Sequence, residues 1–260
     1  TITADYFDIE IEDAIVTLSF NDSLALCFEE AQDLSDIRCA PFVGTRDSAG
    51  AFGRDNLPTQ GDANIGSLST NGIDVTVNYG TDLGFALFSD EEARFDMNFI
   101  GTWTDANDLA SDPTDPTNVT RCAGLFGTTC DEPQATFKWV SRFSYIEGPL
   151  TVSTRWRHLS GTDVDAPIAG EENGLGQRIS AYDLIDLTFR FDATDNVTIS
   201  AGINNLFDTL PDTPVFENGV VVNDTNSLLV GDDNSEQANT FPSTFDVLGR
   251  DFFISAQFRF

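Results

Sequence analysis

The segment Arg250-Asp-Phe-Phe-Ile-Ser-Ala-Gln-Phe-Arg-Phe260 alternates between apolar and polar side chains. A period of two predicts a β-strand with one apolar and one polar face. The apolar face would carry Phe252, Ile254, Ala256, Phe258 and Phe260, and the other face Phe253, Ser255, Gln257 and Arg259. The length suits a tilted strand that crosses a bilayer, which needs roughly 9–11 residues. A strand of a soluble β-sandwich would alternate in the same way, so the other segments decide between the two.

Seven other segments alternate similarly, which predicts eight strands in all. They lie at residues 3–11, 71–79, 94–104, 136–145, 150–158, 184–191 and 197–204. In the first of them Phe7, Ile9 and Ile11 share one face, but Tyr6 lies on the other and leaves the register open. The connections are long after the first, third, fifth and seventh strands and shorter after the others. This layout is typical of outer-membrane barrels, so the fold class expected is all-β, a transmembrane antiparallel β-barrel.

Charged side chains gather on the polar face of the predicted strands. An arginine that faces lipid at the bilayer midplane costs roughly 2–4 kcal/mol, so these residues are expected to face a polar lumen. They are Asp74, Arg94, Asp96, Arg142, Arg155, Arg157, Asp186 and Arg190. Aromatic residues near the predicted strand ends would suit the interfacial girdles of a barrel. They are Tyr79, Trp103, Tyr145 and Trp156.

The composition is strongly acidic, with 43 acidic and 13 basic residues and a formal net charge of −30. Lys138 is the only lysine of the chain. Binding to phosphate backbones needs the opposite sign, so nucleic acid is not an expected partner. No apolar run reaches the ~18 residues of a membrane-spanning helix, and because residues 3–11 already read as a strand, no signal peptide is expected within the sequence.

Four cysteines form two close pairs in polar, turn-rich segments: Cys27 with Cys39, and Cys122 with Cys130. This spacing favours two local disulfides in an oxidising compartment, although four cysteines allow three connectivities. His158 is the only histidine and no Cys-x-x-Cys occurs, so no zinc site is expected. The acidic clusters around Asp108 and Asp233 could bind calcium, but they lack the glycine and the terminal glutamate of an EF-hand loop, which favours solvated loops. We expect no metal site and no cofactor. No nucleophile–base–acid set is visible either, and we expect no enzyme.

Four blocks of the sequence resemble the TonB-dependent outer-membrane transporters. They are Asp5-Tyr-Phe-Asp-Ile-Glu-Ile-Glu-Asp-Ala-Ile15, Gly66-Ser-Leu-Ser-Thr-Asn-Gly-Ile-Asp74, Gly202-Ile-Asn-Asn-Leu-Phe-Asp208 and Phe245-Asp-Val-Leu-Gly-Arg250. Phe245 stands where tyrosine is commoner in the family. The resemblance implies a 22-stranded barrel filled by an N-terminal plug domain. Residues 1–260 would then be the C-terminal part of the barrel, with the plug and the N-terminal strands absent.

The same resemblance implies a function and a set of partners. The protein would import a scarce ligand, an iron chelate or an oligosaccharide, across the outer membrane of a Gram-negative bacterium with energy supplied by TonB. Its partners would be the TonB system, reached through the plug, outer-membrane lipid and lipopolysaccharide, and the remaining strands and plug of the same protein. The apolar face of the last strand would act as a signal for outer-membrane assembly through Phe252, Ile254, Phe258 and Phe260.

Two other interpretations make different structural predictions. A stand-alone eight-stranded outer-membrane barrel, acting as an adhesin or a structural protein, requires the first and last strands to pair. A soluble β-sandwich binding module requires the apolar faces to cover each other.

Overall fold

A computed structural model describes residues 1–17, 23–45, 62–89, 92–110, 119–127, 130–165, 178–211, 216–217, 220–221 and 241–259. The chain forms two compact units. The first comprises Thr1–Asp8, Asn71–Ala106 and Cys122–Phe260, and the second comprises Ile9–Thr70 and Asn107–Arg121. No helix in the described ranges is long and apolar enough to cross a membrane.

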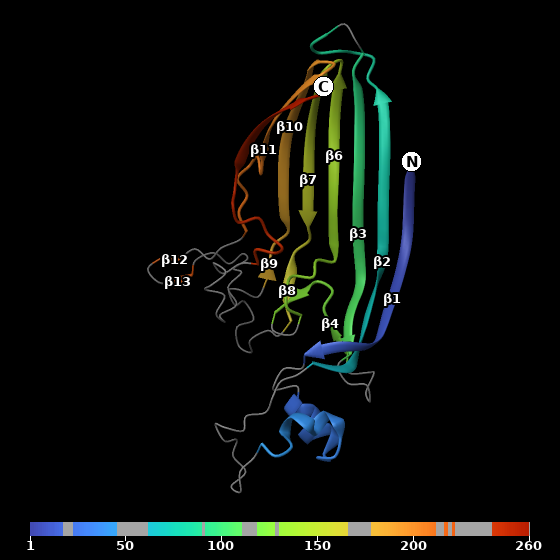
Figure 1. Cartoon of the computed structure of the whole chain (residues 1–260), viewed down its shortest axis with the longest axis vertical. Helices are drawn as coiled ribbons and strands as arrows, with labels where there is room; N and C mark the ends of the chain where they lie inside the picture. Colours follow the sequence, from blue (N-terminus) through green and yellow to red (C-terminus); the bar gives the residue numbers. More distant parts are fainter. Residues whose placement is uncertain are drawn as a thin grey trace. The chain divides into compact units, whose positions relative to one another are not determined.

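Eight long strands lie side by side in the order in which they follow along the chain (Figure 1). They are β1 (Ile2–Thr17), β2 (Asp62–Asp82), β3 (Arg94–Ala110), β6 (Phe137–Glu147), β7 (Leu150–Leu159), β10 (Tyr182–Thr194), β11 (Val197–Asn204) and β14 (Asp251–Phe258). Every pairing from β3 to β14 is antiparallel. Each strand pairs with its neighbours in sequence, so the sheet is a simple meander.

The eight predicted strands are all present, but most are longer than their apolar alternation. β11 has the predicted bounds, whereas β2 begins at Asp62 rather than at residue 71, and β3 continues to Ala110. The end of β3 pairs with the short strand β4 (Val119–Arg121) through Asp108 and Arg121. The residues of these extensions are mostly polar and carry no apolar alternation that could have predicted them.

The long and short connections alternate as the sequence predicts. The short ones lie between β2 and β3, between β6 and β7, and between β10 and β11. Most short elements lie in the long connections. They are η1 (Ala25–Ala31), η2 (Ile37–Phe42), β4, β5 (Leu125–Phe126), β8 (Thr162–Val164), β9 (Arg178–Ile179), β12 (Phe216–Glu217) and β13 (Val220–Val221).

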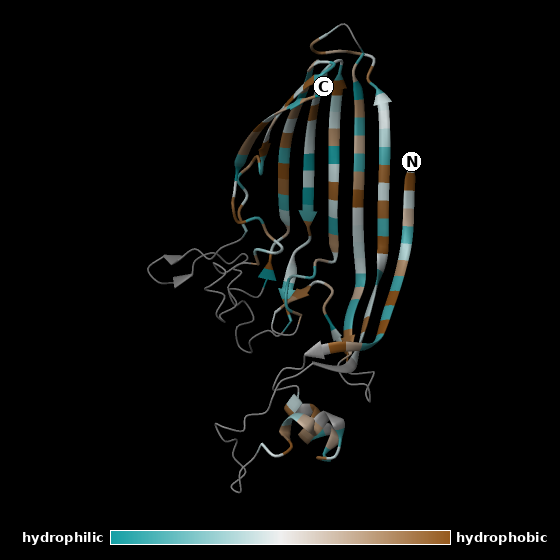
Figure 2. Cartoon of the chain, in the orientation of Figure 1, coloured by the Kyte–Doolittle hydropathy of each residue, from teal (hydrophilic) through white to brown (hydrophobic). Residues whose placement is uncertain are grey.

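Hydrophilic and hydrophobic residues alternate as bands along the strands (Figure 2). Because successive side chains of a strand point to opposite sides, this alternation gives the sheet one polar and one apolar face. The register keeps the two faces separate from strand to strand. On one face Arg142 lies opposite Arg155, and Arg155 lies opposite Asp186. On the other face Tyr145 lies opposite Val152, and Val152 lies opposite Phe189. We call these the polar face and the apolar face of the sheet.

Both alternative folds conflict with this sheet. β1 and β14 form its two edges, and they do not pair with each other in the described part of the chain. The closed eight-stranded barrel is therefore not observed. The apolar face is also uncovered, with Ile254 80% exposed and Phe189, Phe191 and Ile199 exposed as well. A β-sandwich would bury these side chains.

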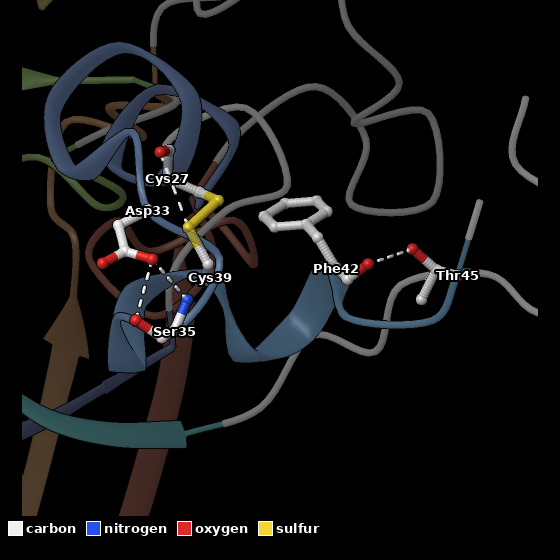
Figure 3. Close-up of a disulfide and its surroundings, with 6 residues drawn as sticks. All are labelled: Cys27, Asp33, Ser35, Cys39, Phe42 and Thr45. Atoms are coloured by element: carbon white, nitrogen blue, oxygen red, sulfur yellow. Dashed lines mark hydrogen bonds between the residues drawn. A yellow bond between two sulfur atoms is a disulfide. The ribbon is translucent and has the colours of Figure 1, made fainter. Parts of the chain in front are cut away.

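In the second unit, a disulfide between Cys27 and Cys39 joins η1 to the 3₁₀-helix η2 (Figure 3). Phe42 packs beside the disulfide, and its ring lies 5.4 Å from that of Phe28. Asp33 accepts hydrogen bonds from the backbone N–H and the hydroxyl of Ser35, which hold the pKa of Asp33 below its usual range.

Two phenylalanines on the polar face cover glycines of the neighbouring strand. Phe253 of β14 lies directly opposite Gly202 of β11, and its ring occupies the space that a Cβ atom on Gly202 would need. Phe7 of β1 covers Gly72 of β2 in the same way. Phe7 therefore shares the face of Asp74, which resolves the register that the sequence left open. An aromatic ring over a glycine pins the register of two strands.

We predict that Gly202→Ala destabilises the sheet by about 1–3 kcal/mol, because the added Cβ would lie 2.5 Å from the Phe253 ring and 2.8 Å from the carbonyl oxygen of Leu187. Guanidinium unfolding in detergent, followed by tryptophan fluorescence, measures the change. Ser200→Ala on the same face of β11 is the matched control and should change stability little. Equal stability of Gly202→Ala and the wild type would contradict the packing described.

Candidate functional site

Asp186 is the centre of an ion-pair network on the polar face. Its side chain is 3% exposed. It accepts hydrogen bonds from Arg155 Nε at 2.7 Å and from Arg157 Nη2 at 3.3 Å. The backbone N–H of Asn205 donates to the same carboxylate at 2.9 Å. The carboxylate therefore ties β7 and β10 to the start of the last long connection.

The other charged residues expected in a lumen also lie on the polar face. Arg94 pairs with Asp96 within β3 at 2.8 Å, and Asp74 of β2 accepts a hydrogen bond from Thr102 at 2.6 Å. Arg190 pairs with Asp192 at 3.0 Å near the short-turn end of β10. The register thus places all eight predicted residues on one face. That this face lines a lumen remains a prediction.

Apolar residues interrupt the polar face at its loop-bearing end. Tyr182 and Leu184 precede Asp186 at alternate positions of β10 and are buried there. They belong to a core cluster that three long connections complete. Its other buried members are Phe126, Val164, Ile179 and Phe245. Segments of the long connections therefore fold back against the polar face.

Hydrogen bonds and a disulfide hold these segments together. The Tyr182 hydroxyl donates to the carbonyl oxygens of Thr209 and Asp246, at 3.4 and 3.2 Å. Glu132 accepts hydrogen bonds from the hydroxyls of Ser243 and Thr244. A disulfide joins Cys122 to Cys130 in the connection that carries Glu132. Both disulfides are thus the local ones, out of the three connectivities that the sequence allowed.

A cavity of about 350 Å³ lies beneath these segments on the polar face. Its sheet wall includes the apolar side chains Ile100, Val140 and Leu184, and Thr244 contributes from the last long connection. Lys138 and Arg157 are the cationic residues that line it. Val140 of β6 lies directly opposite Arg157 of β7, and Lys138 is two residues before Val140, so the two cations are diagonal neighbours on adjacent strands. On the other side of β6, Thr102 of β3 lies directly opposite Lys138.

The two cations are incompletely paired. Lys138 makes no ion pair within the residues that the structure describes, and the Nε of Arg157 is buried without a hydrogen-bond partner there. Unpaired donors beside an apolar wall can bind the anionic group of a ligand that also has an apolar part. Sequence reasoning missed this site: Lys138 and Leu184 were visible as members of strands, but their grouping depends on the register of β6, β7 and β10, which the sequence did not give. Of the described residues, only Thr244 reaches the cavity from a long connection.

A second cavity of about 360 Å³ lies on the same face toward the short turns. Asn78, Arg94, Asp96 and Arg142 line it. Here Asn98 donates a hydrogen bond to Asn78 at 2.6 Å, so polar side chains of this region pair with one another.

His158 lies on the apolar face, within a cluster of aromatic side chains. It stacks on Trp139 at a ring distance of 5.4 Å, and Trp156 meets the same tryptophan edge-on. Asp183 accepts a hydrogen bond from Trp156 Nε1 at 2.7 Å and lies 2.9 Å from His158 Nδ1. Tyr79 and Trp103 are exposed on the apolar face as well.

The last strand presents the expected assembly signal on the apolar face. Phe252, Ile254 and Phe258 are all exposed there, while Phe260 lies outside the described residues. The assignment of these residues to an assembly signal remains a prediction.

A meander of long strands with an exposed apolar face and a charged opposite face defines the wall of a transmembrane β-barrel. Residues 1–206 match the family described as TonB dependent receptor-like, beta-barrel. The match covers more than half of the 260 residues, and the chain belongs to this family. Barrels of this family are typically in the outer membrane of Gram-negative bacteria. A search of curated proteins found no match.

We predict that Asp186→Ala lowers the free energy of unfolding by about 3 kcal/mol, because it leaves Arg155 and Arg157 without their buried counter-charge. This is the lower end of the usual range, since both arginine side chains are more than one third exposed. The matched control is Asp192→Ala, which removes an exposed ion pair from the same face of β10 and should cost less than about 1 kcal/mol. Similar losses for the two variants in guanidinium unfolding would contradict the central role of Asp186.

Proposed function

We propose that this chain is part of the barrel of an active transporter that imports a scarce ligand across the outer membrane with energy supplied through TonB. Membership of the TonB-dependent receptor barrel family supports this proposal. The cavity beneath the returning connections carries it further, because it offers a ligand both cationic groups and an apolar wall at the loop-bearing end of the sheet. The proposal assigns no catalytic step to the chain.

The ligand class that we propose is an iron chelate, with an oligosaccharide as the second candidate. In a chain of net charge −30, Lys138 and Arg157 form a local cationic site. Ferric chelates with carboxylate groups would match that charge, whereas a neutral oligosaccharide would use the polar groups of Thr102 and Thr244.

The two edges of the sheet support a proposal about which further parts of the protein complete the barrel. In lipid, the unpaired backbone groups of β1 and β14 would each be costly. We propose that further strands of the same protein pair with both edges, that a plug domain fills the barrel and contacts TonB, and that outer-membrane lipid and lipopolysaccharide surround it. The charged residues from Asp74 to Arg190 on the polar face would then line the plug-filled lumen.

Uptake by the full-length protein tests the transport proposal. Cells that express it should accumulate radiolabelled ferric chelate, or labelled oligosaccharide, only when TonB is present. Uptake that persists unchanged without TonB would contradict energised import. Failure of every chelate and oligosaccharide to bind would contradict both proposed ligand classes.

We predict that Lys138→Ala weakens binding of a ferric carboxylate chelate about tenfold, the usual loss for one charge-assisted hydrogen bond. The control is Arg190→Ala, which removes a cation from the same face but outside the cavity. Isothermal titration of the purified full-length protein measures both affinities. An unchanged affinity in Lys138→Ala, or an equal loss in both variants, would exclude the cavity as the binding site.

A further inference from the structure

The connection between β2 and β3 exposes three large apolar side chains at the short-turn rim. Phe85 is 53% exposed, Leu87 64% and Phe88 72%. The segment is nevertheless held in a defined conformation. The N–H of Leu83 donates to the carbonyl oxygen of Ala93 at 2.8 Å, and the N–H of Ala93 donates to that of Phe85 at 3.1 Å. We call Phe85, Leu87 and Phe88 the rim patch.

A buried carboxylate fixes this patch in place. Glu147, the last residue of β6, accepts hydrogen bonds from the backbone N–H groups of Leu87 at 2.9 Å and Phe88 at 2.7 Å. The backbone N–H of Ser89 and the hydroxyl of Tyr145 donate to the same carboxylate. Glu147 is only 2% exposed. Four donors thus satisfy a charge that would otherwise be costly to bury.

The alternation of β6 shows on which side the rim patch lies. Glu147 follows Tyr145 and Phe143 at alternate positions, so all three belong to the apolar face. The register confirms this, since Glu147 lies opposite Leu150 and Tyr145 opposite Val152. The connection must therefore fold over the end of the apolar face to reach the carboxylate. The rim patch continues the apolar face instead of closing the polar one.

We propose that the rim patch is a lipid anchor that inserts into the interfacial layer of the leaflet on the short-turn side, the periplasmic leaflet. The proposal rests on the placement of the apolar face in the membrane. Its continuity with that face identifies lipid as the occupant, and phenylalanine and leucine are suited to the boundary between headgroups and acyl chains. Glu92, which follows in the chain, is exposed, and the anchor requires its carboxylate to remain in water.

Spin labelling of the full-length protein in phospholipid bilayers tests the anchor. The four cysteines of residues 1–260 are all in disulfides, so within this part of the protein the thiol introduced at Phe88→Cys is the one that takes a nitroxide label. Power saturation then compares collisions of the label with oxygen, which concentrates in lipid, and with a nickel chelate, which stays in water. Two reference sites are Phe189→Cys on the apolar face of β10 and Asp195→Cys in the short turn after β10.

The anchor predicts that the label at position 88 collides more with oxygen than with nickel, as the label at 189 does and the label at 195 does not. Nickel-dominated collisions at 88, with oxygen-dominated collisions at 189, would overturn the anchor alone. Nickel-dominated collisions at both positions would overturn the membrane placement as well. Protection of position 88 from both reagents would show a protein occupant and also overturn the anchor.

A separate measurement tests whether Glu147 holds the rim patch in place. Glu147→Gln keeps the size of the side chain but weakens its hydrogen bonds from the backbone, so the label at 88 should become more mobile and more accessible to nickel. If that variant does not fold, Tyr145→Phe removes one donor to the carboxylate and should shift the label in the same direction by less. An unchanged label in the folded variant would show that Glu147 does not position the rim patch.

Discussion

The structure depends on the need of every backbone N–H and C=O group for a hydrogen-bond partner where no water is present. A meander of eight long strands meets this need for six strands on both sides and for β1 and β14 on one side each. Because backbone groups pair whatever the side chain, the ends of the strands can be polar and still pair, as the end of β3 does with β4. The same need also makes the two edges the places where we propose that further strands pair.

The alternation of apolar and polar residues that produces the two faces also determines where charged groups and a ligand-binding cavity can lie. Charges on the polar face pair within a strand, as Arg190 does with Asp192, and across strands at Asp186, where two arginines and a backbone amide meet one carboxylate. Beside this network the long connections return and cover an apolar part of the same face. The result is a cavity in which Lys138 has no paired acid within the described residues, although acidic residues dominate the chain.

Local alternation predicted the strands and the polarity of their faces, because both depend on neighbouring residues only. It could not predict contacts between distant segments. The sequence placed Leu184 in a strand but did not explain why an apolar side chain interrupts the polar face. The structure does, because Leu184 belongs to the same buried cluster as Phe245 of the last long connection. The strand predicted from alternation ended at residue 145, but Glu147 ends β6 and accepts hydrogen bonds from backbone amides 58 to 60 residues away.

The most direct test of the two-faced wall is the reactivity of single cysteines along β10 of the full-length protein in outer-membrane vesicles. A water-soluble, membrane-impermeant maleimide would be applied to cysteines placed at Ile185, Leu187 and Phe189 on the apolar face and at Thr188 and Arg190 on the polar face. The account predicts that the polar-face cysteines react and that the apolar-face cysteines do not. Equal reactivity on both faces, or reaction of the apolar-face cysteines alone, would contradict it.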